Sequence, residues 1–514
     1  MFRNRFLSVY AVAFAAGVAG VLWAYAVWGA ISFVRCAAVC FFACTALLLP
    51  GLLLRKKRPA LLRSALLIVL GLLCGGGRML LASTGEAYEP YVGRQDTVVG
   101  SVVESASYEN GRERVIRIRQ SHTSIPKGTL VLLYARTPLP VRVGEQVTVS
   151  LTGVRLPDAS QRAEGVSLVA DGEILSVGSG KTWGSGVLSA LRQACERLYA
   201  PYGEEGVAQA LLLRERSALT SATTGAYRNA GLSHLLAISG LHLVIYMAIL
   251  HRIVGRMALP RWMSVPLLLL ALLGFSYMTS FSPSVLRAAV MLGILTVAEF
   301  LNHRVDRLTT LFVALLFLLL WDPYALLSVS LQLSFLACLG LLLLQTHISE
   351  LCYRIRRKHY YGRGSRRYRL LASAAGSVLT SCSVLLFTFP VLVFSFGQVA
   401  YLSPLMNLLV LPFFAPLLSL LLLSVLAYFL LPPLAPVLAF LPGQALRLLE
   451  AFLGLLYRAN IGSVDADPRR MVLPVLLACC AVLSALLSKK HTFRFYWSFS
   501  AAFAVALTVG LVLG

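Results

Sequence analysis

Long apolar stretches, separated by short basic or turn-forming segments, make up most of the chain. A helix of roughly 20 apolar residues spans a bilayer, and stretches near this length recur throughout. Three of them precede position 91, at 6–28, 31–54 and 61–82. Ten more follow position 230, at 231–253, 263–281, 284–300, 308–321, 326–345, 370–396, 403–430, 434–457, 471–488 and 494–513. The pattern predicts a polytopic α-helical membrane protein of about 13 spans, with an uncleaved first span because its apolar part is too long for a signal peptide.

A different periodicity occupies residues 92–180. Apolar and polar residues alternate there, as in strands with one buried face, in short Val-rich runs at 97–105, 112–121, 129–136, 144–154 and 166–177. Five short strands in this length predict a small all-β domain of the OB type, a barrel that often binds oligonucleotides. A β-sandwich without a ligand is the alternative.

One of these runs places basic side chains on the outer face of the predicted barrel. Alternation points Ile116 and Ile118 toward a core and Arg117 and Arg119 away from it. The two arginines are therefore candidates for a DNA-binding surface, since phosphates are bound mainly by Lys and Arg.

The remaining segment before the second group of spans is amphipathic. Residues 187–199 carry an apolar stripe largely opposite Arg192, Glu196 and Arg197, which predicts an amphipathic helix that either lies on the outer membrane surface or caps the membrane domain. The predicted domains are three N-terminal spans at 1–91, the OB-like domain at 92–180, interfacial helices at 181–230 and a channel-type membrane domain at 231–514.

The distribution of charge predicts how the chain crosses the membrane. Only 13% of the residues are charged and 58% are hydrophobic, yet the net charge is +24. Basic segments between alternate spans fall on one side, which the positive-inside rule assigns to the cytoplasm together with the N-terminus. The OB-like domain is then extracytoplasmic. The weak point is the predicted span at 403–430, where Pro404, Pro412 and Pro416 leave a re-entrant pair as the alternative.

Motifs for cofactors, metals or catalysis are incomplete. Gly180-Lys181-Thr182 resembles the end of a P-loop, but Leu175 stands where the loop needs glycine. The ten cysteines include no Cys-x-x-Cys pair, and no histidines have zinc-binding spacing. Ser239 and His242 are close enough for a serine hydrolase, although Ala237 replaces the first glycine of an intramembrane protease motif. We therefore expect no enzyme activity, no cofactor and no metal.

Polar residues inside the predicted spans are the main candidates for function, because they are costly at membrane depth. Each of them has an ordinary alternative, either a hydrogen bond between helices or, for Arg287, a side chain that reaches back to the interface. Together they predict one polar path, formed by His234, Ser239, Gly240, His242, Ser284, Arg287, Gln332, Ser334 and Asn407.

A basic loop and a scarcity of acids indicate an anionic cargo. Residues 351–369 interleave tyrosines with eight basic residues, among them Arg356, Arg357 and Lys358. Such a segment suits single-stranded nucleic acid, but contact with anionic membrane lipid is the more common role of a cytoplasmic basic loop. Between positions 308 and 457 the only acids are Asp322, Glu350 and Glu450, which disfavours a cation-coupled transporter.

Several of these segments resemble one family. The run Ala230-Gly-Leu-Ser-His-Leu-Leu-Ala-Ile-Ser-Gly-Leu-His242 is similar to the signature of the ComEC/Rec2 family, the inner-membrane DNA-uptake channels of naturally competent bacteria. Further resembling segments follow in the same order, at Ser282 to Ala288, Asp322-Pro323, Leu331 to Ala337, Phe396-Gly397 and Ser403 to Pro412. The three leading spans and the OB-like segment correspond to the N-terminal portion of that family.

The resemblance implies passage of single-stranded DNA through the cytoplasmic membrane during natural transformation. It also implies a DNA receptor outside and a cytoplasmic helicase, since the sequence shows no ATPase motif. Many members end in a metallo-β-lactamase-like domain, and the sequence has no such segment after its last predicted span, so either a separate nuclease acts or strand degradation happens otherwise. A channel or transporter for another anionic substrate, and a scaffold that binds a partner through the OB-like domain, remain alternatives.

Overall fold

The computed structural model describes residues 11–19, 70–71, 74–76, 90–107, 114–122, 125, 129–135, 145–158, 161–162, 165–178, 185–213, 215, 218–257, 259–279, 282–303, 305–358 and 365–465. The predicted spans at 31–54, 471–488 and 494–513, with most of 6–28 and 61–82, lie outside the described residues. The chain divides into two compact units, one of residues 1–191 and 246–331 and the other of residues 192–245 and 332–514.

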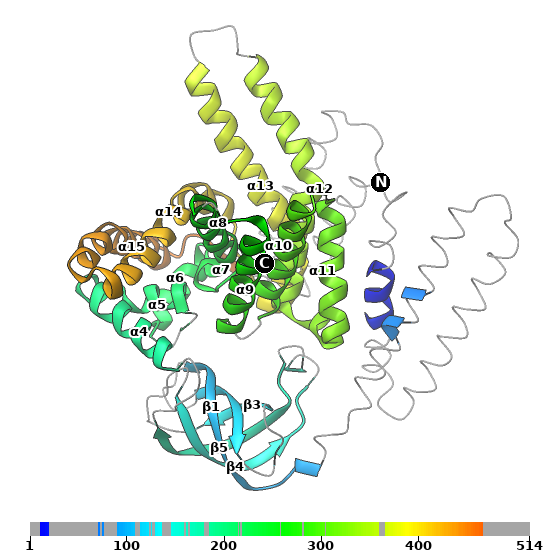
Figure 1. Cartoon of the computed structure of the whole chain (residues 1–514), viewed down its shortest axis with the longest axis vertical. Helices are drawn as coiled ribbons and strands as arrows, with labels where there is room; N and C mark the ends of the chain where they lie inside the picture. The colour runs from blue at the N-terminus through cyan, green and yellow to red at the C-terminus, as the bar shows by residue number, and fades with distance from the viewer. Residues whose placement is uncertain are drawn as a thin grey trace, which may run out of the picture. The chain divides into compact units, whose positions relative to one another are not determined.

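The first unit contains a closed barrel of five strands (Figure 1). Its strands are β1 (Asp96–Ser107), β2 (Arg114–His122), β3 (Leu130–Ala135), β4 (Gln146–Arg155) and β5 (Leu168–Gly178). The order around the barrel is β1-β2-β3-β5-β4, and β4 closes it by pairing with β1. All pairs are antiparallel except β3 with β5, which are parallel and joined through the connection that contains β4.

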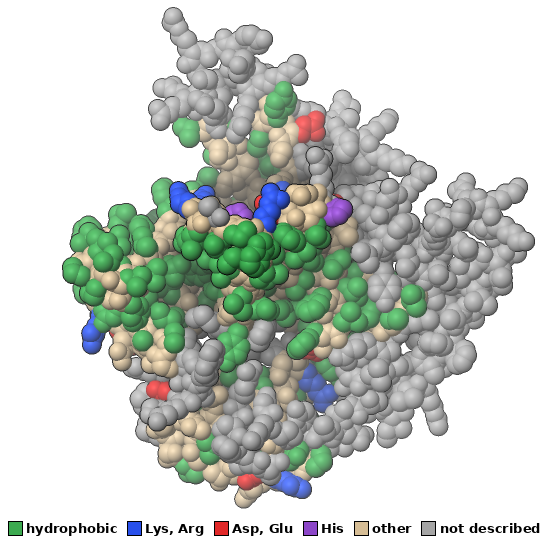
Figure 2. All heavy atoms as spheres, viewed as in Figure 1, with side chains coloured by type: hydrophobic (Ala, Val, Ile, Leu, Met, Phe, Trp, Pro, Cys, Tyr) green, Lys and Arg blue, Asp and Glu red, His purple; other side chains and the backbone are tan. Residues whose placement is uncertain are grey.

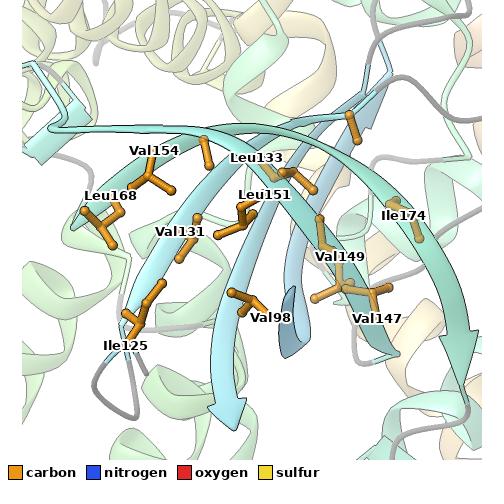
Figure 3. Close-up of a cluster of buried hydrophobic side chains, with 13 residues drawn as sticks. Val98, Ile125, Val131, Leu133, Val147, Val149, Leu151, Val154, Leu168 and Ile174 are labelled. Atoms are coloured by element: carbon orange, nitrogen blue, oxygen red, sulfur yellow. The ribbon is translucent and has the colours of Figure 1, made fainter. Parts of the chain in front are cut away.

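Alternation along the strands builds the barrel core, as the Val-rich runs predict. Figure 3 shows side chains of all these strands except β2 converging on one interior, among them Val98, Val131, Leu151 and Ile174. The β2 register aligns Ile116 with Leu133 and Ile118 with Val131, two residues of this core. Positions 117 and 119 align with Leu132 and Leu130, on the opposite face of β3.

A stacked pair links the barrel to the helices of the same unit. The Arg162 guanidinium lies 5.6 Å from the centre of the Tyr324 ring and donates a hydrogen bond of 3.2 Å to the Tyr324 hydroxyl. Arg162 belongs to the connection between β4 and β5, and Tyr324 to the 3-10 turn η3 (Pro323–Leu327). The Asp322 carboxylate accepts from the Tyr324 backbone N–H at 2.9 Å and fixes this turn.

Apolar helices complete the first unit: α9 (Arg261–Met278), α10 (Pro283–Phe300) and α11 (Arg307–Trp321). Pro283 stands at the first position of α10, where the missing N–H has no helical partner to lose. Asp306 caps α11 by accepting from the Thr309 N–H at 2.9 Å. These boundaries match the predicted spans at 263–281, 284–300 and 308–321 to within three residues.

The second unit packs a group of short helices on two long ones. The short helices are α4 (Ser185–Tyr199), α5 (Glu205–Leu213) and α6 (Ser221–Asn229), and the long ones are α14 (Ser403–Leu430) and α15 (Ala435–Arg458). The Tyr199 and Ser424 hydroxyls, on α4 and α14, are hydrogen-bonded at 2.6 Å. The buried Arg192 of α4 forms an ion pair of 2.7 Å with Glu215.

The same unit contains a helical hairpin of α12 (Val329–Lys358) and α13 (Ser365–Phe396) (Figure 1). The two helices meet closely at Gly340, where an added Cβ would lie 2.7 Å from the Phe387 ring. The basic loop predicted at 351–369 thus includes the end of α12 and the start of α13. The side chains of Arg356, Arg357 and Lys358 lie outside the described part of the chain.

Two predicted spans contain residues that could interrupt a helix, and only the first of them is interrupted. The stretch 231–253 is divided into α7 (Ser233–Leu236) and α8 (Gly240–Arg256), with Ala237–Ser239 between them. In contrast, 403–430 is one continuous helix, with Pro404 in its first turn and Pro412 and Pro416 inside it. The alternative of a re-entrant pair at these prolines is therefore wrong.

The helical surface is that of a membrane protein. Three helices are long and apolar enough to cross a bilayer, at Leu370–Phe396, Ser403–Leu430 and Pro432–Arg458, and α9, α11 and the first half of α12 are shorter apolar helices. Figure 2 shows hydrophobic side chains covering most of the described helical surface in that view, with few charged ones. Large side chains such as Leu270, Phe413 and Leu448 are more than 60% exposed, which is suited to contact with lipid.

Candidate functional site

The break between α7 and α8 is closed by hydrogen bonds that Ser239 makes with Leu241 and His242. The Leu241 N–H donates to the Ser239 hydroxyl oxygen at 3.3 Å, and the Ser239 N–H donates to His242 Nδ1 at 3.3 Å. The arrangement resembles a capping box, with histidine in the position usually held by Glu or Gln, but the serine hydroxyl accepts from the N–H of Leu241, one residue before His242. The spacing Ser-x-x-His thus has a structural role, which sequence reasoning did not recognise.

The capping bond fixes the chemical state of the His242 ring. Because Nδ1 accepts the Ser239 N–H, the proton of the neutral imidazole is on Nε2. His242 is 0% exposed, and Nε2 has no hydrogen-bond partner among the described residues. The ring packs edge-on against Phe414 of α14, with 5.3 Å between centres. His242 therefore offers one buried N–H donor that the fold does not use.

The geometry disfavours a hydrolase at this position. The Ser239 hydroxyl is 3.2 Å from His242 Nδ1, but Nδ1 also accepts a backbone N–H and the hydroxyl oxygen accepts the Leu241 N–H. A general base needs a nitrogen free to take the serine proton, and the nucleophile needs a free lone pair. The cap occupies that nitrogen, whereas the serine oxygen keeps its second lone pair.

Gly231 allows the signature segment to lie against the start of α14. Its φ is +73°, and a Cβ there would lie 2.6 Å from the Ser403 Cβ and 2.9 Å from the Ala400 Cβ. His234 Nδ1 is 3.2 Å from the Gly231 carbonyl oxygen, while its side chain is otherwise exposed. Two segments that the sequence singled out separately, at Gly231 and Ser403, are thus brought together.

We expect Gly231→Ala to destabilise the second unit. The left-handed backbone and the contact with Ser403 together cost roughly 2–4 kcal/mol in an alanine variant. Thermal unfolding of the purified protein measures this loss, and Gly255→Ala, where an added Cβ meets nothing within 4 Å, is the matched control. Equal midpoints for the two variants would contradict the close packing.

Asn407 lies one turn into α14, on the side of Ser403. Its Nδ2 is 3.5 Å from the Ser403 hydroxyl oxygen, and its Oδ1 is buried without a hydrogen-bond partner among the described residues. Unused buried polar atoms are uncommon in folded proteins. The second unit therefore has one unused acceptor, Asn407 Oδ1, and one unused donor, His242 Nε2. They lie on the two segments that the sequence analysis singled out, the start of α14 and the motif that ends at His242.

A polar network next to this site was not predicted. Ser463 is hydrogen-bonded at 2.6 Å to both Asn229 Oδ1 and Gln398 Nε2, and Asn229 Nδ2 donates to the Ile461 carbonyl oxygen at 2.8 Å. The network ties the end of α6 to the segments before α14 and after α15. The only sequence signal was Asn229 itself, a polar residue directly before the Ala230-Gly231 motif.

The other predicted path residues lie elsewhere. Ser284 and Arg287 are on α10 in the first unit, and Gln332 and Ser334 are on α12 in the second. Arg287 is 6% exposed, with its guanidinium 3.5 Å from the Met291 sulfur, which does not fit a side chain that reaches the surface. The side chains of Arg117 and Arg119 are outside the described part of the chain.

Comparison with known proteins shows the family of the chain. A family model described as "Competence protein" matches residues 211–492, more than half of the 514 residues. The chain belongs to the competence protein family. This confirms the resemblance to ComEC/Rec2 proteins, and the matched range includes α7, α8 and α14, which form the candidate site.

A curated relative supports the same assignment. The chain is 32% identical over 215 residues to ComE operon protein 3 of Bacillus subtilis (strain 168), an alignment that covers 42% of this competence protein. The aligned part spans about a quarter, 25%, of the length of that relative. No solved structure matches the chain.

Proposed function

We propose that this competence protein is a channel that passes single-stranded DNA across the cytoplasmic membrane during natural transformation. The observation that carries the proposal is the family match over residues 211–492, which includes the Gly231 to His242 segment and its contact with α14. A role in DNA uptake further agrees with the membrane-protein surface of the helices and with the net charge of +24.

The chemistry of the residues that we assign to the path, taken in each unit separately, suits a strand that carries one phosphate per nucleotide. His242 Nε2–H and the Arg287 guanidinium are donors that bind phosphate oxygens, and Asn407 Oδ1 accepts from base amino groups. A carboxylate in the path would repel the phosphates of the strand, and the helices supply few of them. We assign to the path His234, Ser239, Gly240, His242, Ser284, Arg287, Gln332, Ser334 and Asn407.

The barrel is proposed to be an extracytoplasmic OB-like domain that receives the strand. Five strands closed in the order β1-β2-β3-β5-β4 support the OB assignment. The proposed topology, with about 13 spans and a cytoplasmic N-terminus, places the Arg356 to Lys358 segment inside, at the emerging strand. A receptor outside and a helicase inside are the partners, and the channel itself needs no enzymatic step.

The barrel is tested through the salt dependence of DNA binding. We expect Arg117→Ala with Arg119→Ala to weaken binding of single-stranded DNA by the full-length protein in nanodiscs. The slope of log K against log salt should fall in magnitude by roughly 1.4, since each lost phosphate contact removes about 0.7. Fluorescence anisotropy measures the slope. The control is Arg256→Ala with Arg261→Ala, which removes two charges from a predicted cytoplasmic segment. If the salt slope changes equally in the two double variants, the barrel is not the DNA-binding surface.

The direct test of the channel is entry of labelled DNA. A competent host that carries this gene in place of its own should accumulate nuclease-resistant labelled DNA, and deletion should stop entry while binding at the cell surface continues. Entry that is unchanged by deletion contradicts the channel. Loss of uptake of another anion on deletion would favour a different transporter, and loss of surface binding alone would favour a scaffold.

A further inference from the structure

The short helices of the second unit run alongside α14 over most of its length. At one end, the Tyr199 hydroxyl of α4 is hydrogen-bonded to the Ser424 hydroxyl at 2.6 Å. At the other end, Gly231 lies against Ser403, where an added Cβ would be 2.6 Å from the serine Cβ. Ser403 and Ser424 are 21 residues apart on α14, or about 32 Å at 1.5 Å per residue. The segment therefore covers a length of α14 close to the hydrocarbon core of a bilayer, which is about 30 Å thick.

Contacts with α15 follow the same order along the chain. A Cβ added at Gly443 would lie 2.5 Å from the Tyr202 ring. Seven residues further along α15, the Glu450 carboxylate accepts a hydrogen bond from the Thr223 hydroxyl of α6. The network around Asn229 then ties the end of α6 to the chain after α15. The segment thus lies beside both long helices from one end to the other.

The first part of this segment is an antiparallel helical hairpin of α4 and α5, with its tip at the 3-10 helix η2 (Ala200–Tyr202). Gln209 of α5 donates to Glu196 of α4 at 3.4 Å, and further from the tip Arg192 pairs with Glu215 at 2.7 Å. Both contacts satisfy polar groups within the protein. The chain therefore runs along α4 to the level of Ser424, reverses at η2 and returns through α5 and α6.

The exposed surface of the segment is polar. Between positions 192 and 230, no large apolar side chain is exposed among the described residues. A helix that lies on a membrane surface presents an apolar face to the lipid, as α14 does at Phe413 and α15 at Leu448. The exposed side chains of α4 and α6 in this range include Gln193, Arg197, Ser221, Thr224 and Arg228.

A polar surface at this depth requires water. Non-helical backbone at membrane depth is tolerated only where it is buried in protein or lines a water-filled cavity. The segment has such backbone at 203–204 and 218–220. Because the segment extends along α14, a bilayer crossed by α14 also contains the segment, and its polar face then needs an aqueous space.

We propose that residues 192–230 are a re-entrant segment, which lies beside α14 at membrane depth and lines a water-filled part of the DNA path with its polar face. The proposal rests on the proposed channel function. The exposed charges of the described segment are Arg197 and Arg228, whereas Glu204 and Glu215 are buried. Two cations without an exposed acid suit the phosphates of a passing strand. A re-entrant segment begins and ends on one side of the membrane, so it leaves the proposed order of spans unchanged.

Thiol accessibility tests the position of the segment without DNA. Gln193→Cys and Thr224→Cys, in the full-length protein in cells, should react with a small membrane-impermeant methanethiosulfonate added outside. They should not react with a large polyethylene glycol maleimide, because a narrow aqueous passage admits only the small reagent. The unsubstituted protein measures the background from its ten native cysteines.

Two control sites calibrate the reagents. Leu448→Cys, 74% exposed on the apolar face of α15, should react with neither reagent, and Glu173→Cys, exposed on strand β5 of the barrel, should react with both. Reaction of Gln193→Cys and Thr224→Cys with both reagents overturns the proposal, because the segment then lies outside the membrane. Reaction with neither also overturns it, because lipid or protein then covers the polar face.

Single-stranded DNA then tests the ligand. A bound oligonucleotide should slow the labelling of Thr224→Cys by the small reagent. Arg228→Ala should lower DNA entry roughly 5-fold, as for the loss of one solvated charge contact, while Arg458→Ala, an exposed cation at the end of α15, should transport normally. Labelling that DNA does not slow, or normal entry in Arg228→Ala, would remove DNA from this face. Since labelling by the small reagent requires no transport, failure of the channel proposal leaves the position of the segment readable.

Discussion

Replacing His242 by alanine is expected to reduce DNA entry by roughly 10- to 100-fold while the protein stays folded in the membrane. A hydrogen bond to a charged group contributes about 1.5–3 kcal/mol, and the variant loses the His242 Nε2–H that we assign to a phosphate. Loss of the capping bond destabilises α8 by only about 1 kcal/mol, which a folded protein tolerates. Nuclease-resistant labelled DNA measures entry, and the amount of protein in purified membranes measures folding.

Two further variants separate the cap from the donor. Gln fits the capping box and keeps an N–H donor, so His242→Gln should retain part of the DNA entry. Glu also fits the box but offers no donor when ionised, so His242→Glu should fail in entry. Because a carboxylate is costly at this buried position, the amount of each variant in purified membranes is measured beside its DNA entry. Normal entry in His242→Ala, or equal entry in the Gln and Glu variants, would remove His242 from the path.

Sequence periodicity predicted most of the described fold because burial and lipid contact dictate it. The boundaries of α9, α10, α11, α14 and α15 follow the apolar stretches, whereas α12 and α13 extend into the basic segment between them, and the barrel core follows Val-rich alternation. The prolines of α14 misled the prediction in part. Pro412 and Pro416 each remove one backbone donor, but the surrounding apolar turns keep the helix continuous in the structure.

The candidate site was only half predictable. Ser239 and His242 stood out because polar groups are costly in apolar segments, yet their mutual capping depends on the backbone break at Ala237–Ser239. The network of Asn229, Gln398 and Ser463 joins positions up to 234 residues apart, which no local pattern reveals.

The position of Arg287 argues for a direct contact with the transported strand. It lies one turn after the start of α10, where the helix dipole disfavours a cation, and its side chain is 6% exposed within an apolar helix. The helix N-terminus and the guanidinium together form a positive region that suits a phosphate.

We expect Arg287→Ala to lower DNA entry by roughly 30-fold or more, because truncating one partner of a buried charged contact costs about 2–5 kcal/mol. Arg287→Lys keeps the charge but loses the planar fork, so its entry should lie between that of the alanine variant and the unchanged protein. Arg261→Ala, an exposed cation at the start of α9, is the control and should transport normally. Entry at the normal level in Arg287→Ala would show that this arginine only supports the packing of α10. A loss of DNA entry that is matched by a fall in the amount of the Arg287→Ala protein in membranes would show the same. A loss of entry without such a fall supports contact between Arg287 and DNA.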